Sequence, residues 1–171
     1  MLSLFVVFEA SGLRQNLSLD YLRATLADNP WRGGIVFVLL FCAGNLLQIP
    51  GWIFLAAAVI TLGKIYGGLL TYVAAVISCL AIYGLIRGLG GNALRELDSP
   101  LARKLFRYMD DRPLMSVVAL RTIFQTAPPL NYSLALSGVQ YRYYVLGTII
   151  GLPLPIAGYC LAFDLLFAEL L

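Results

Sequence analysis

The chain of 171 residues contains no histidine, only nine Asp or Glu and only twelve Lys or Arg. Without histidine it lacks the commonest general base and the commonest zinc ligand, which disfavours most hydrolytic chemistry. A soluble domain typically has about a quarter of its residues charged, whereas here 12% are charged and 60% are hydrophobic. Because so few charges cannot cover a soluble surface, we expect a membrane protein that is not an enzyme.

Cysteine is also scarce, at three residues that lie far apart in apolar segments with no CxxC spacing: Cys42, Cys79 and Cys160. Buried thiols in such segments usually behave as small apolar side chains. We therefore predict packed thiols and expect no disulfide, no metal site and no cofactor.

Long uncharged stretches are what the sequence does contain. No charged residue lies between Arg32 and Lys64, or between Lys64 and Arg87. A transmembrane helix needs about 20 apolar residues to cross the hydrocarbon core. The segments Ile65–Ile86 and Tyr143–Phe163 meet this length, and we predict that both are transmembrane helices.

The stretch Gly33–Gly63 is too long for one span, and Pro50 and Gly51 divide it into two arms. Proline removes a backbone donor and glycine permits a sharp turn. An arm of about 13 helical residues reaches only about 20 Å, less than the core of about 30 Å. The pattern predicts a re-entrant hairpin with its tip at Pro50, which is tolerated only where protein or water covers the freed backbone groups.

Leu114–Gln140 repeats this order, with Pro128 and Pro129 at the break. A shift of the first region by 78 residues places Pro50 on Pro128 and Lys64 on Arg142. Because one span separates the two units, the second hairpin must enter from the opposite face. We predict an all-α integral membrane protein, built as an inverted repeat of a re-entrant helical hairpin plus a transmembrane helix.

The remaining segments are polar or short. Leu17–Ala27 has the mixed composition of an interfacial helix, after a partial apolar segment at the N-terminus. The basic stretch 87–112 predicts a cytoplasmic loop, with an amphipathic helix at Pro100–Met109. The single membrane domain thus divides into 1–32, 33–86, 87–112 and 113–171.

Three segments carry an unusual combination of residues: Ile49–Gly63, Ala81–Gly90 and Leu120–Gly138. In the last, Arg121 precedes a proline pair and then Asn131 and Tyr132, all in an apolar context. From about Leu17 to its end, the chain resembles the DedA superfamily, also called the VTT-domain or SNARE-associated Golgi protein family.

The resemblance implies two re-entrant hairpins that face one another from opposite leaflets, and a role in moving lipids between leaflets. Members are associated with phospholipid scrambling in eukaryotes and with recycling of polyprenyl-phosphate carriers in bacteria. The better-studied DedA branch has an acidic residue just after the Pro-Gly, where this chain has Trp52. We therefore do not expect proton coupling through a buried carboxylate in the first half. Members usually have further helices at both ends, so we interpret the chain as a fragment or a minimal member.

The candidate binding residues lie at and near the two predicted tips. A helix that restarts after a proline offers a phosphate unpaired N–H groups and a partial positive charge. Arg121 lies about 10 Å from the second tip, where it either binds phosphate or snorkels to the interface. Arg87 either binds phosphate or anchors its span, and the amides Asn45, Gln48 and Asn131 either bind a headgroup or join helices. The predicted substrate-binding residues are Arg121, Arg87, Pro50, Gly51, Pro128, Pro129, Asn131, Tyr132 and Gln48.

We expect lipid translocation, in which an anionic phosphate headgroup passes through a polar seam between the tips. The alternatives are an ion-coupled carrier of small solutes, for which Asp164 is the candidate acid, and a non-transporting scaffold that acts through the cytoplasmic loop. The expected partners are membrane lipids and not nucleic acid, in a bacterial inner membrane, a plasma membrane or, in a eukaryote, an organelle membrane. The glycines Gly67, Gly68, Gly147 and Gly151 can pack helices within one chain or between copies, which leaves a homo-oligomer open.

Overall fold

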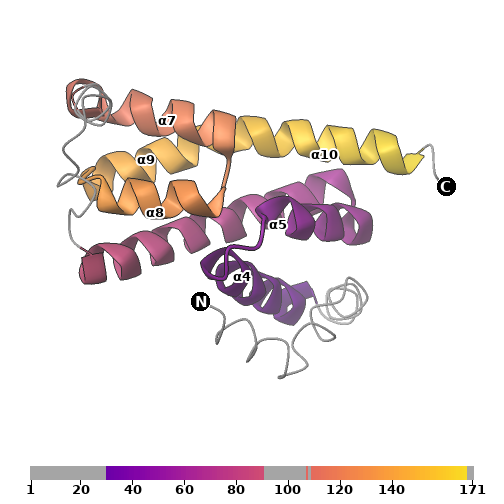
Figure 1. The fold of residues 1–171 in the computed structure, drawn as a ribbon. Helices are drawn as coiled ribbons and strands as arrows, with labels where there is room; N and C mark the ends of the chain where they lie inside the picture. The colour runs from indigo at the N-terminus through magenta and orange to yellow at the C-terminus, as the bar shows by residue number, and fades with distance from the viewer. Residues whose placement is uncertain (1–29, 91–106, 108, 169–171) are drawn as a thin grey trace.

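A computed structural model describes residues 30–90, 107 and 109–168. Within these ranges the regular elements are all helices, and no strand occurs. They are α4 (Pro30–Leu46), α5 (Gly51–Gly90), α7 (Pro113–Phe124), α8 (Pro128–Leu136), α9 (Tyr141–Gly151) and α10 (Pro153–Ala168), as Figure 1 shows. The all-α prediction is confirmed for this part of the chain. The predicted interfacial helix Leu17–Ala27 and most of Pro100–Met109 lie outside the described residues.

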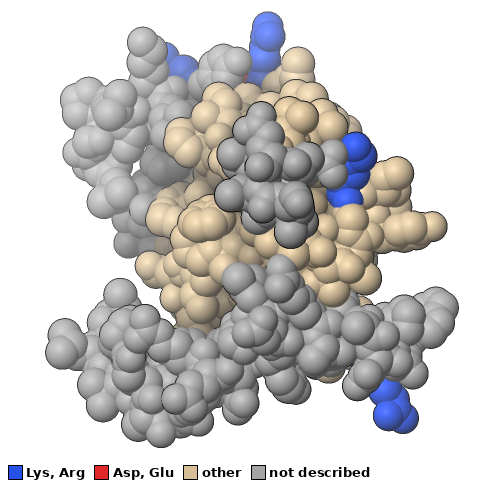
Figure 2. Space-filling model, turned by 90° about the vertical axis from the view of Figure 1, so that its right-hand side faces the viewer, with Lys and Arg blue, Asp and Glu red and all other residues tan. Residues whose placement is uncertain are grey.

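Two helical stretches are long and apolar enough to cross a membrane, Gly51–Leu89 and Tyr141–Phe163. Large apolar side chains on them point outward, including Ile65, Leu89 and Leu154, which are 66%, 80% and 70% exposed. In the face drawn in Figure 2, the described surface is mostly uncharged. An apolar surface this extensive is typical of contact with lipid. The chain is therefore membrane-associated.

A kink at Gly63 divides α5 into a short first part, residues 51–62, and a long second part, residues 64–90. Gly63 has φ 78° and ψ 168°, a backbone conformation that favours glycine. The kink falls between the predicted second arm of the first hairpin and the predicted span Ile65–Ile86. The first part lies beside α4, and the second part runs back along the molecule (Figure 1).

The second predicted span, Tyr143–Phe163, lies within a helical stretch long and apolar enough to cross a membrane, Tyr141–Phe163, but it contains a break. α9 ends at Gly151 and α10 begins at Pro153. Because proline has no N–H, the carbonyl of Ile149, four residues earlier, loses its helical donor. The hydroxyl of Tyr72 on α5 donates to this carbonyl over 3.0 Å.

Pro155 frees a second carbonyl in the same way, that of Gly151. The hydroxyl of Thr122 on α7 lies 3.3 Å from this carbonyl and 2.9 Å from the carbonyl of Val118 in its own helix, so its single hydrogen is shared between the two. Neighbouring hydroxyls are one of the means by which membrane helices tolerate proline. The break thus attaches the α9–α10 junction to two other helices, which the spacing of apolar residues alone did not predict.

Close helix contacts position α9 against α7. A Cβ atom added at Gly147 would lie 2.6 Å from Val117, and one added at Gly151 would lie 2.6 Å from the Cβ of Arg121. Only glycine fits at such separations. Both glycines therefore pack helices within one chain, and they bring α9 close enough for its polar side chains to contact Arg121.

Candidate functional site

The described chain makes two similar turns near the middle of the molecule. Turn 1, residues 47–50, joins α4 to α5, and turn 2, residues 125–127, joins α7 to α8. Each contains a glutamine with positive φ shortly before a proline, Gln48 at 65° and Gln125 at 53°. Positive φ is uncommon outside glycine. The two halves therefore share a local backbone feature as well as a proline.

Turns 1 and 2 meet from opposite ends of the molecule. In Figure 1, α4 and the first part of α5 extend from turn 1 toward one end, whereas α7 and α8 extend from turn 2 toward the other. A Cβ atom on Gly51 would lie 2.5 Å from Thr126 Oγ1, so the two turns are in contact.

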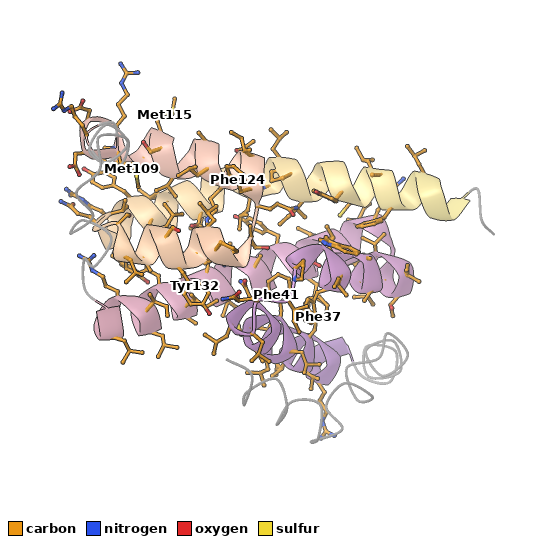
Figure 3. All side chains as sticks on the ribbon, in the orientation of Figure 1. Phe37, Phe41, Met109, Met115, Phe124 and Tyr132 are labelled. Atoms are coloured by element: carbon orange, nitrogen blue, oxygen red, sulfur yellow. The ribbon has the colours of Figure 1, made fainter. Side chains whose placement is uncertain are left out.

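Tyr132 joins the two turns through a hydrogen bond. Its hydroxyl donates to the carbonyl of Leu46 over 2.7 Å, and Figure 3 shows Tyr132 on the side of α8 that faces α4. Leu46 is the last residue of α4, where carbonyls have no donor within the helix. The predicted site residue Tyr132 therefore satisfies a backbone group of the other half.

Arg121 is completely buried behind turn 2 and forms four hydrogen bonds. Its Nη1 donates to Asn131 Oδ1 at 2.5 Å and to the carbonyl of Gln125 at 3.2 Å. Nη2 donates to the Tyr144 hydroxyl at 2.7 Å, and Nε donates to Thr148 Oγ1 at 3.3 Å. Gln125 lies in turn 2, directly after the end of α7, so Arg121 also holds this turn against the helix that precedes it.

The hydrogen bonds continue from Asn131 into the first half of the chain. Asn131 Nδ2 donates to Asn45 Oδ1 at 3.0 Å, and Asn45 Nδ2 donates to Ser78 Oγ at 2.9 Å. The Tyr144 hydroxyl donates to the carbonyl of Cys79 at 3.0 Å. The thiol of Cys79 also donates to Asn131 Oδ1, at 3.4 Å. We call this set the buried network; it joins α4, α5, α7, α8 and α9, and its side chains are those of Asn45, Ser78, Cys79, Arg121, Asn131, Tyr144 and Thr148.

Among the described residues, the buried network holds a positive charge with neutral partners. Arg121 is 0% exposed, and each of its hydrogen-bond acceptors is an amide, a carbonyl or a hydroxyl. The carboxylates with described side chains, Asp110 and Asp111, are exposed before the start of α7. The burial of Arg121 also contradicts the alternative in which it snorkels to the interface. A lone cation at membrane depth is costly, and such residues usually mark a functional site.

The other predicted site residues have different positions. Asn131 lies in the network, whereas Gln48, Pro50 and Pro129 are exposed and Gly51 is half-buried at the contact between the turns. The side chain of Pro128 is not described.

Arg87 lies outside the buried network. It donates to the carbonyl of Ala135 at 3.5 Å, in the last turn of α8, where the helix dipole favours a cation.

Tyr144, Thr148 and Ser78 were not among the predicted site residues. Tyr144 did carry a signal, because the shift of 78 residues pairs it with Tyr66, and Thr148 follows it one helical turn later on the same face. Ser78 is one of several hydroxyl-bearing residues in the predicted span Ile65–Ile86, and nothing in the sequence marks it as a partner of Asn45.

A small cavity lies beside the contact between the turns. Its volume is about 10 Å³, and its lining includes Gly51, Thr71 and Thr126. Thr71 Oγ1 is buried without a hydrogen-bond partner among the described residues. A cavity of this size has room for about one water molecule, which could bond to Thr71 Oγ1.

Comparison with protein families matches residues 49–165 to the VTT domain. No curated protein and no solved structure matches the chain. The matched region begins at turn 1, contains the kink at Gly63 and includes Arg121, Asn131 and Tyr144 of the buried network. It covers more than half of the chain and confirms the resemblance inferred from the sequence. The protein therefore belongs to the VTT-domain family, the domain of the DedA and SNARE-associated Golgi proteins.

Proposed function

We propose that this protein moves lipids with anionic phosphate headgroups between leaflets, without catalysing a reaction, and that the headgroup passes between turns 1 and 2. The observation that carries the proposal is the buried guanidinium of Arg121, whose partners are all neutral. An anion at this position would neutralise a charge that the described protein groups leave uncompensated.

The proposed membrane arrangement follows from the two turns. The second part of α5 and the α9–α10 pair would be the spanning segments, and the helices around each turn would be re-entrant hairpins that enter from opposite faces. The meeting of the turns from opposite ends of the molecule supports this inverted repeat, as do the paired glutamines with positive φ. In inverted-repeat transporters the substrate site lies near the midplane, between the repeats.

The chemistry of the guanidinium suits a phosphate. Arginine has five N–H donors in a planar fork that matches two phosphate oxygens. Asn131 is hydrogen-bonded to both Arg121 and Asn45, so parting the turns would disturb the acceptor on Nη1. Phosphate oxygens could then replace the oxygens of Asn131 and Tyr144 with little movement of the arginine.

The test is lipid exchange in liposomes that contain the purified full-length chain. Labelled phosphatidylglycerol and labelled polyprenyl phosphate would be followed for wild type, Arg121→Gln, Arg121→Lys and the control Arg142→Gln. Arg142 is exposed on α9, so its neutralisation removes the same charge outside the seam.

We expect lipid exchange in wild type and in Arg142→Gln. In Arg121→Gln the rate of exchange should fall about tenfold or more, which corresponds to the free energy of a charge-assisted hydrogen bond. Arg121→Lys keeps the charge but not the fork, and its rate should lie between the two. Circular dichroism would confirm that each variant is folded. No exchange of either lipid by folded wild type would refute the proposal.

A further inference from the structure

A surface groove between α5 and α10 is distinct from the buried network. Its volume is about 530 Å³, within the range of about 300–1,000 Å³ that is usual for ligand sites. The α5 side includes Lys64, Gly68 and Tyr72, and the α10 side includes Ala157 and Cys160. These positions recur at helical spacing, so each helix contributes one continuous face.

The groove is apolar. Gly68 has no side chain, and a Cβ atom there would lie 2.9 Å from the Cys160 sulfur. Exposed apolar side chains form its walls, with Ile65 and Leu69 at 66% and 59% exposure. Tyr72, whose hydroxyl donates to the carbonyl of Ile149, lies at one end. Lys64 lies at the other end, about 12 Å away along the helix.

The membrane limits what can occupy such a groove. In hydrocarbon no water is available to fill an apolar hollow, and an empty hollow forfeits the dispersion contacts of its walls. A flexible acyl chain can follow the groove. Lys64, placed by the kink at Gly63, adds a cation at the mouth of the groove.

We propose that this groove binds an anionic phospholipid, with one acyl chain between α5 and α10 and the phosphate at the ammonium of Lys64. The lysine stem follows apolar surface while its charge reaches the headgroup region. The inference rests on membrane association and not on transport, because a protein that moves no lipid would still hold one here.

The test uses the full chain in nanodiscs with phosphatidylglycerol or phosphatidylcholine that carries a photoactivatable group in one acyl chain. After illumination, peptide mass spectrometry locates the adducts. Ala157→Phe fills the groove from an exposed lining position, and Ala162→Phe is the matched control on the exposed surface of α10 outside the groove. Lys64→Gln tests the headgroup contact.

We expect adducts of phosphatidylglycerol concentrated on the facing residues of α5 and α10, lost in Ala157→Phe and kept in Ala162→Phe. Lys64→Gln should lower the preference for phosphatidylglycerol over phosphatidylcholine about fivefold. This ratio corresponds to the attraction of about 1 kcal/mol between one basic residue and anionic lipid. Adducts spread evenly over the apolar surface would overturn the proposal. So would a cross-linked dimer through α5 and α10, which would make a second copy the occupant. Either result can occur whether or not the liposome assay detects lipid exchange. The proposal of a lipid-binding groove can therefore be refuted independently of the proposal of lipid translocation.

Discussion

Tyr144→Phe is the most informative single change in the buried network, because it removes one oxygen and keeps the ring. In wild type that oxygen accepts a hydrogen bond from Arg121 Nη2 and donates one to the carbonyl of Cys79. Tyr144 is 0% exposed, so the variant leaves a charged donor and a carbonyl without their partner in a buried place.

The expected loss of stability follows from these two bonds. A hydrogen bond to a charged group contributes about 1.5–3 kcal/mol in soluble proteins, whereas side-chain hydrogen bonds between membrane helices average about 0.6 and reach about 1.7 kcal/mol. Because one of the two bonds is charge-assisted, we expect a decrease of about 1–2 kcal/mol in the free energy of unfolding. Equilibrium unfolding in mixed micelles of increasing SDS content, followed by circular dichroism, would measure it.

Tyr143→Phe is the matched control for this experiment. Tyr143 is the preceding residue, it is half-buried, and its ring lies under the exposed Arg142 outside the network. We expect its removal of a hydroxyl to change stability by less than about 0.5 kcal/mol. Equal losses in Tyr143→Phe and Tyr144→Phe would refute the argument that the network stabilises the junction of the helices.

Two further predictions concern hydroxyl groups that donate to backbone carbonyls. Tyr72→Phe leaves the carbonyl of Ile149 without its donor and should lower stability by about 0.5–1.5 kcal/mol in the same unfolding assay. Thr122→Val should lower it less, because the Thr122 hydroxyl is shared with the carbonyl of Val118 in its own helix; unchanged stability in both would contradict the stated role of these hydroxyls. Tyr132→Phe removes the bond to Leu46 across the two turns, so the turns should part more easily and lipid exchange in liposomes should rise about twofold to tenfold. A slower rate in a folded Tyr132→Phe protein would mean that the hydroxyl assists passage instead of holding the turns together.

The sequence predicted helices and breaks well where proline, glycine and the absence of charge act locally. Pro50 and Gly51 lie where α4 gives way to α5, and Gly63 lies at the kink, because these residues restrict or free the backbone whatever surrounds them. Pro153 acts in the same way, because it divides the predicted span Tyr143–Phe163 into α9 and α10, which together keep the length of a membrane span.

The candidate site was less predictable because it depends on contacts between distant segments. Arg121 stood out as a charge in an apolar stretch, but its burial depends on close packing at Gly147 and Gly151. The contact of Asn131 with Asn45 joins two residues 86 positions apart. No local pattern specifies that pairing, although two amides near two predicted tips were a sign that the tips are polar.

A reversible cross-link between turns 1 and 2 tests the central proposal most directly. Cys42 and Cys160 would be replaced by alanine and Cys79 by serine, which keeps a donor to Asn131 Oδ1. In this protein, Gly51→Cys and Thr126→Cys would place two thiols at the contact between the turns, where the side chains at positions 51 and 126 are close enough for a disulfide. If headgroups pass between the turns, oxidation should abolish lipid exchange in liposomes and reduction should restore it, while either single variant is unaffected by oxidant. Exchange that continues at the same rate in the fully oxidised protein would show that lipids do not pass between the turns.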